Sequence, residues 1–92
     1  TEFKTKMNDP NVIVLDVRTP AETAEGKIPN AIEIDIQIPD FQQRIEALDK
    51  DKTYLVYCKM GGRSARACGA MQELGFKQLY NLEGGFTAYS KE

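Results

Sequence analysis

The sequence contains no histidine and only two cysteines, Cys58 and Cys68. Without a histidine, the Cys–His pair of a thiol protease cannot form, so a cysteine nucleophile would have to be activated by backbone amides and fixed cations. Two cysteines alone also cannot complete a tetrahedral zinc site, and disulfide-stapled folds normally use more of them. We therefore predict reduced thiols, with no metal and no cofactor.

Long apolar runs and a strong charge of one sign are also missing. No apolar stretch approaches the roughly 18 residues needed to cross a bilayer, so we expect no membrane partner. The 12 Lys and Arg residues against 14 Asp and Glu leave a net charge of −2. Because the basic residues are scattered, the sequence argues against a nucleic-acid surface.

The chain of 92 residues shows no internal repeat and no linker, which predicts one domain over residues 1–92. That domain should face small molecules. Its first residues have no signal-peptide pattern, so we expect a cytoplasmic protein. A periplasmic location stays open if a leader has been removed.

Apolar, β-branched runs alternate along the chain with segments of helical spacing, which predict strands and helices respectively. Thr19-Pro20-Ala21-Glu22 combines an N-cap, a first-turn proline and an acidic early turn, as at a helix start. The mixed segment 2–8 has some helical character. The predicted strands are 12–15, 31–34, 53–57 and 78–80, and the predicted helices are 20–25, 41–48, 63–74 and 86–89. This alternation predicts an α/β fold with a mostly parallel sheet and helices on both faces.

Cys58 lies where a predicted buried strand ends and a glycine-containing loop leads into a helix. Ligands of parallel α/β sheets bind outside the carboxyl ends of the strands, and a helix start offers unpaired N–H groups. A free thiol with a pKa of ~8.5 is only about 3% thiolate at neutral pH, and lowering that pKa by about two units needs roughly 2.7 kcal/mol. Gly61 and Gly62 can take positive φ angles that aim backbone amides at one anion, while Lys59 and Arg63 add positive charge. The sequence therefore predicts a nucleophilic Cys58.

Other candidate residues admit structural roles. Asp16 and Arg18 lie at the carboxyl end of the first strand, where an ion pair between them would tie loops together. Ser64 fits an N-cap better than a catalyst. Cys68 falls on the predicted buried side of its helix, which favours a core thiol over a resolving thiol. The pair Gly84-Gly85 predicts a tight turn into the last helix.

Four segments in order resemble the rhodanese-like sulfurtransferase domain: Leu15-Asp16-Val17-Arg18, residues 25–31, residues 58–64, and residues 80–86. The match spans nearly the whole chain. The resemblance implies a three-layer α/β/α domain around a five-stranded, mostly parallel sheet, of which the residues here predict four strands.

The same resemblance implies a function and a site. Cys58 matches the cysteine that takes a sulfane sulfur from a donor such as thiosulfate and passes it on through a persulfide. The loop positions Lys59, Met60, Gly61, Gly62 and Arg63 match the loop whose amides hold the persulfide or the anionic oxygens of the donor. A basic residue directly after the cysteine resembles the thiosulfate-using members, and the acceptor would be cyanide, a thiol or a thioredoxin-like protein. Independently of the resemblance, the positions of Ser64, Asp16 and Arg18 predict supporting roles.

Two other functions stay open. Related phosphatases and arsenate reductases also use a cysteine on an amide-lined loop, but they place five residues before the arginine, and only four separate Cys58 from Arg63. Rhodanese-like domains also serve as interaction or sulfur-relay modules without turnover. The loop length favours the transferase over the phosphatase, and the presence of Cys58 favours it over the interaction module.

Overall fold

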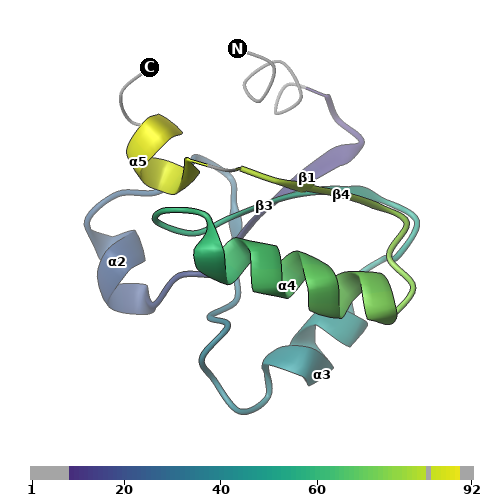
Figure 1. Ribbon diagram of the computed structural model, residues 1–92. Helices are drawn as coiled ribbons and strands as arrows, with labels where there is room; N and C mark the ends of the chain where they lie inside the picture. Colours follow the sequence, from purple (N-terminus) through teal and green to yellow (C-terminus); the bar gives the residue numbers. More distant parts are fainter. Residues whose placement is uncertain (1–8, 83, 90–92) are drawn as a thin grey trace.

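A computed structural model of the chain describes residues 9–82 and 84–89 (Figure 1). Strands and helices alternate along the chain, as the sequence predicts. The sheet has four strands, all parallel, in the spatial order β2-β1-β3-β4. The elements are β1 (Val12–Asp16), α2 (Pro20–Ala24), β2 (Ile32–Glu33), α3 (Phe41–Glu46), β3 (Thr53–Tyr57), α4 (Gly62–Glu73), β4 (Gln78–Asn81) and α5 (Gly85–Tyr89).

The two central strands, β1 and β3, form the frame of the sheet. They pair in parallel from Val12 beside Thr53 to Asp16 beside Tyr57. Their apolar residues are buried on both faces, which is why neither strand alternates in polarity. Strand β2 is shorter than the predicted 31–34, although the Ile34 N–H still bonds the Asp16 carbonyl at 2.9 Å. All four strands therefore run their carboxyl ends toward one side of the molecule.

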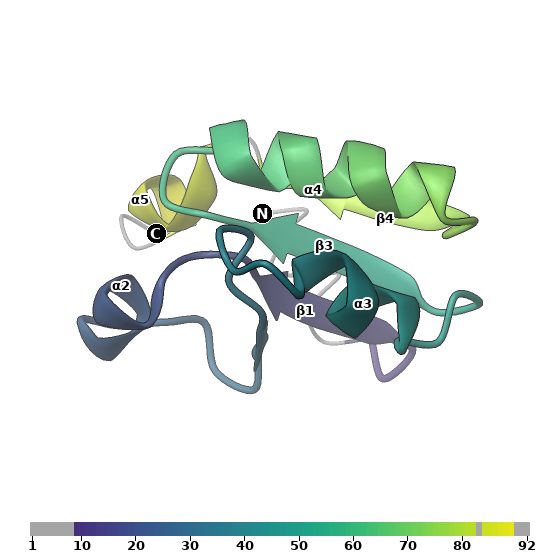
Figure 2. The same ribbon diagram turned by 90° about the horizontal axis from the view of Figure 1, so that it is seen from below.

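Helices cover both faces of the sheet, giving three layers (Figures 1 and 2). On one face α3 and α4 pack through Ile45, Ala67 and Met71 onto the strands. On the other face, α5 and the segment around Ile28 cover the buried side chains of Leu55 and Tyr57. The predicted three-layer α/β/α fold is confirmed.

Helix starts follow the sequence in one case and depart from it in another. Thr19 caps α2, as predicted, and the structure adds a reciprocal capping box with Glu22. Helix α4 begins at Gly62, one residue earlier than predicted, and is preceded by Gly61 with a φ of 104°. The predicted helical segment 2–8 lies outside the described residues, as does Glu83. None of the described helices is long and apolar enough to span a membrane.

Candidate active site

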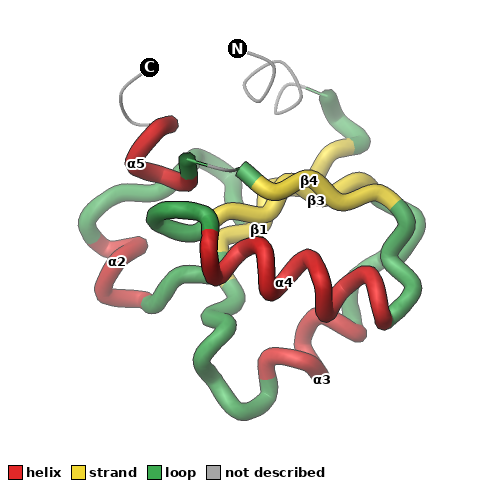
Figure 3. Tube along the Cα trace, in the orientation of Figure 1, coloured by secondary structure: helices red, strands yellow, loops and turns green. Residues whose placement is uncertain are grey.

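Cys58 follows the last residue of β3 and lies beneath the loop that leads into α4, with only 1% of its surface exposed. In Figure 3 this loop lies between the starts of α4 and α5, on the same side of the molecule as α2. The structure therefore places the thiol at the carboxyl end of the sheet, as the sequence predicts.

Backbone amides converge on the Cys58 sulfur. The Gly61 N–H donates to Sγ at 3.0 Å and the Ser64 N–H at 3.4 Å, and the Ser64 hydroxyl lies 3.5 Å away. Burial alone would raise the pKa of the thiol, but hydrogen bonds from Ser64, Gly61 and the Met60 N–H outweigh it and bring the pKa below its ordinary value. The site therefore favours an anion on sulfur without any histidine.

Helix α5 fixes how the loop's peptide groups point. The Phe86 N–H donates to the Cys58 carbonyl at 2.8 Å, and the Thr87 N–H donates to the Lys59 carbonyl at 3.2 Å. In a trans peptide the carbonyl and the following N–H point in opposite directions. Anchoring the Lys59 carbonyl on α5 therefore turns the Met60 N–H toward the sulfur.

Gly85 makes the close approach of α5 to the loop possible. Its φ is 62°, and a Cβ at this position would lie 2.3 Å from the Lys59 carbonyl oxygen. The sequence predicts only a turn here. The contact with the loop after Cys58 could not be found from spacing, because it joins separate motifs of the chain.

The prediction that Ser64 is an N-cap is wrong. Gly61 precedes the helix, and Ser64 lies within the first turn of α4, fully buried against the Cys58 sulfur. The Ser64 hydroxyl also donates a hydrogen bond to Asn81 on β4, a residue that the sequence analysis did not single out. The serine therefore belongs to the surroundings of the sulfur.

Arg63 does not present a free charge to the thiol. Its two terminal nitrogens each lie 2.7 Å from one carboxylate oxygen of Glu22 on α2. These hydrogen bonds lower the pKa of Glu22 to about 2. The pairing links α2 to the start of α4, and no local pattern signals it, because the two residues lie 41 positions apart.

The remaining loop positions differ in what they can contribute. Lys59, the residue after Cys58, is exposed. The Met60 side chain is 70% exposed, so Met60 acts on the sulfur through its N–H alone. Gly61 takes a positive φ, as predicted. Gly62 does not, since it is the first residue of α4, and a Cβ there would contact nothing within 4 Å.

Asp16 and Arg18 form the predicted ion pair, with an Arg18 terminal nitrogen 2.9 Å from a carboxylate oxygen. Both side chains are buried, and the same arginine donates to the Gly26 carbonyl at 2.7 Å. The Tyr57 hydroxyl donates to Asp16 at 2.6 Å and accepts from the Ile28 N–H at 3.1 Å. This cluster holds the 26–28 segment against the sheet, so its role is support.

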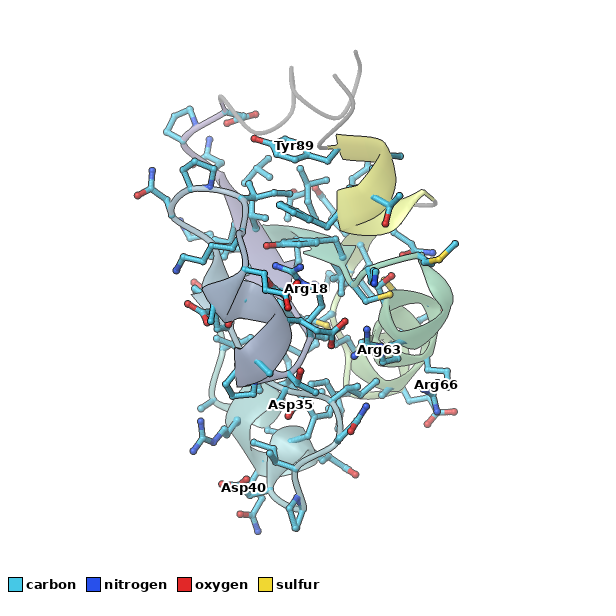
Figure 4. All side chains as sticks on the ribbon, turned by 90° about the vertical axis from the view of Figure 1, so that its left-hand side faces the viewer. Arg18, Asp35, Asp40, Arg63, Arg66 and Tyr89 are labelled. Atoms are coloured by element: carbon cyan, nitrogen blue, oxygen red, sulfur yellow. The ribbon has the colours of Figure 1, made fainter. Side chains whose placement is uncertain are left out.

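An open cleft of about 220 Å³ adjoins the loop and carries charges of both signs. Figure 4 looks at this side of the molecule, where Arg18 lies beside α2, Arg63 lies between α2 and α4, and Arg66 lies farther out. Among residues 9–82 and 84–89, no group of three or more potential metal ligands comes together. The cleft is lined by Arg18, Glu22, Glu25, Gly26, Lys59, Phe86 and Thr87.

Cys68 lies away from this cleft. It is half-buried on α4, packed against the same core as Ala67 and Met71. Burial raises the pKa of the Cys68 thiol to about 11, so it is protonated at neutral pH. The two thiols of the protein therefore differ sharply in acidity.

Comparisons with known proteins identify relatives of the whole chain. The family model of the rhodanese-like domain matches residues 1–92. A protein of Allochromatium vinosum named "Sulfurtransferase" is 35% identical over 81 residues, covering 88% of this chain and 74% of that protein. The crystal structure of a rhodanese-like domain protein from Staphylococcus aureus matches with a TM-score of 0.84 and 34% identity, covering 96% of this chain and 84% of that one.

One group of relatives carries a different name. A "tRNA uridine(34) hydroxylase" of Cytophaga hutchinsonii is 38% identical over 94 residues, which cover 99% of this chain. The same match covers only 30% of the hydroxylase. The likeness therefore concerns one part of that protein.

Proposed function

The chain belongs to the rhodanese-like domain family, and from this premise we propose that it is a sulfurtransferase that carries a sulfane sulfur on Cys58 as a persulfide. The observation that carries the proposal is the convergence of loop amides on a buried sulfur whose pKa is lowered. Such a cradle stabilises negative charge on sulfur both before and after transfer.

In the first half of the reaction, the Cys58 thiolate attacks the outer sulfur of thiosulfate. A new S–S bond forms to Cys58, the bond between the two sulfur atoms of thiosulfate breaks, and sulfite leaves with the electron pair. The terminal sulfur of the persulfide then carries the negative charge and remains within reach of the loop amides. The step needs no external oxidant, because the transferred sulfur arrives at the oxidation level at which it leaves.

In the second half, a thiophilic acceptor attacks the outer sulfur of the persulfide and regenerates the Cys58 thiolate. Cyanide would leave as thiocyanate, and a thiol or a thioredoxin-like protein would leave as its own persulfide. Lys59, exposed on the wall of the adjoining cleft, would attract the anionic oxygens of the donor.

The geometry argues against phosphatase activity. Four residues separate Cys58 from Arg63, and both terminal nitrogens of that arginine are occupied by Glu22. A phosphatase needs such an arginine to be available for the phosphate oxygens. The observation supports sulfur transfer over phosphate chemistry.

Intact mass measurement tests the proposal directly. After incubation with thiosulfate and removal of excess donor, the protein should gain one sulfur atom, and cyanide should remove it as thiocyanate. Cys58→Ser should gain no sulfur, whereas the matched variant Cys68→Ala should behave as the parent protein. A parent protein that never gains sulfur, or gains it on Cys68, would favour the interaction-module alternative.

A further inference from the structure

Asn81, the last residue of β4, contacts the sulfur site through two partners. Its side-chain oxygen accepts a hydrogen bond from the Ser64 hydroxyl, and its side-chain nitrogen donates to the Gly61 carbonyl at 3.4 Å. Ser64 in turn lies against the Cys58 sulfur. Asn81 therefore reaches the sulfur only through Ser64 and the loop backbone.

The Gly61 carbonyl fixes the orientation of the Asn81 amide. A carbonyl oxygen only accepts hydrogen bonds, so the amide nitrogen must face it and the amide oxygen must face Ser64. That oxygen also only accepts, and the Ser64 hydroxyl must therefore donate to it. The backbone of the loop thus dictates where the serine's proton points.

A hydroxyl group has a single proton, and several acceptors surround it. Besides the Asn81 oxygen, the Gly61 carbonyl oxygen lies 3.1 Å from Ser64 Oγ and the Cys58 sulfur lies 3.5 Å from it. While the thiol is protonated it can donate to Ser64. Once it ionises, the Ser64 hydroxyl can donate to the sulfur and lower the pKa of Cys58, but the Asn81 oxygen competes for the same proton.

We propose that Asn81 is a positioning residue that restrains the reactivity of Cys58 by competing with its sulfur for the Ser64 hydroxyl proton. This inference rests on the proposed function only in taking the Cys58 thiolate as the reacting group. It predicts that Asn81 sets the fraction of Cys58 that is ionised. Asn81 would do so without contacting the Cys58 sulfur, the sulfur donor or the sulfur acceptor.

Fixed charges near the sulfur stay the same when Asn81 is changed. Arg63 on α4 interacts with Cys58 and is itself paired with Glu22 on α2 and acted on by Asp35. Lys59 lies next along the loop. The uncharged substitution Asn81→Ala therefore tests the hydroxyl proton without changing a fixed charge.

The test is the pH dependence of the thiolate, followed by ultraviolet absorbance and by the rate of iodoacetamide alkylation, with Cys58→Ser as blank. Asn81→Ala should lower the Cys58 pKa by about half a unit, a roughly threefold gain in thiolate, because the hydroxyl is released to the sulfur. Asn81→Asp should raise the pKa, because a carboxylate accepts the proton more strongly and adds negative charge. Gln78→Ala, on the same strand but bonded to Thr53, is the matched control and should change nothing.

Ser64→Ala decides whether the effect passes through the serine. In that background Asn81→Ala should no longer shift the Cys58 pKa, since there is no hydroxyl to compete for. Shifts of the same sign in Asn81→Ala and Asn81→Asp, or a shift that survives in Ser64→Ala protein, would overturn the proposal. If Asn81→Asp does not fold, the double-mutant cycle of Ser64→Ala and Asn81→Ala still tests whether Asn81 acts on the Cys58 pKa through Ser64.

These measurements use no sulfur donor, so the outcome is independent of whether the protein transfers sulfur. A protein that forms no persulfide but shows the predicted shifts would refute the proposed function and leave the role of Asn81 standing. A protein that transfers sulfur but shows no pKa shift would refute the role of Asn81 and leave the proposed function standing.

Discussion

The Glu22 carboxylate forms a bidentate ion pair with the Arg63 guanidinium, each oxygen lying 2.7 Å from one terminal nitrogen. The same carboxylate accepts from the backbone N–H and the hydroxyl of Thr19, at 3.1 Å each. One side chain therefore caps α2 and also holds the start of α4, beside the loop that follows Cys58. This relationship makes Arg63 part of a neutral pair at the edge of the sulfur site.

The hydrogen bonds of Glu22 should make part of the free energy of unfolding depend on pH in the acid range. Because the hydrogen bonds from Arg63 lower the pKa of Glu22 from 4.5 to about 2, this part is fully present above pH 4.5 and is lost as the pH falls toward 2. Glu22→Gln should cost about 1 kcal/mol of unfolding free energy at pH 7, as expected for a partly exposed pair. Urea denaturation at several pH values checks this, and a difference between parent and variant that persists at pH 2 would contradict it.

Arg63→Ala should raise the pKa of Cys58, because the sulfur loses a nearby positive charge while the Glu22 carboxylate remains. Adding Glu22→Gln to this variant should reverse part of the rise, since the unpaired negative charge is then also gone. The pH dependence of thiol alkylation measures both. A parent pKa near 8.5 that neither variant moves would remove the electrostatic basis of the site.

Lys59→Ala should mainly raise the Michaelis constant for thiosulfate, by about fivefold, which corresponds to about 1 kcal/mol of donor attraction. High salt should reproduce part of this effect in the parent protein by screening. Lys77→Ala, an exposed lysine that does not line the cleft, serves as the matched control. An equal effect of the two substitutions would show that only net charge matters.

Cys68→Ala should leave turnover near that of the parent protein and cost about 1 kcal/mol of stability through lost packing. Because burial raises the pKa of Cys68 to about 11, alkylation at neutral pH should modify Cys58 alone. Mass spectrometry of the alkylated protein locates the adduct. A large loss of turnover in folded Cys68→Ala protein would show that this thiol takes part in the chemistry.

Gly85→Ala should cost about 2 kcal/mol or more and should also raise the Cys58 pKa, because its Cβ would push the Lys59 carbonyl away from α5. The matched substitution is Gly69→Ala in the interior of α4, where a Cβ would meet nothing within 4 Å. That variant should instead gain about 0.5 to 1 kcal/mol from helix propensity. Thermal denaturation and thiol titration of the two variants separate them, and similar behaviour would refute the close-contact argument.

The sequence could reveal the local parts of this structure. The strand ending at Tyr57, the cap at Thr19 and the ion pair of Asp16 with Arg18 each join residues within a few positions, where spacing and residue type are informative. The position of Cys58 at a strand end followed from the same kind of pattern. The parallel sheet followed from the alternation of elements.

Contacts between distant motifs could not be predicted in this way. Ser64 is an ordinary helix-start residue in sequence, and its bond to Asn81 spans 17 positions. Glu22 is an ordinary first-turn acid until folding brings Arg63 to it. Because hydrogen bonds of this kind depend on how elements are docked, a single sequence carries no periodic signal for them.

The docking of α5 determines when, during folding, the Cys58 thiol gains all of its hydrogen-bond donors. The two N–H groups that anchor the Cys58 and Lys59 carbonyls belong to the last described helix, so the Met60 N–H is oriented toward the sulfur only once that helix is in place. A chain in which α5 has not docked would lack the anchor on the Lys59 carbonyl, and with it the contribution of the Met60 N–H to the lowered pKa of Cys58. The Cys58 thiol therefore has its full set of hydrogen-bond donors only in the completed domain.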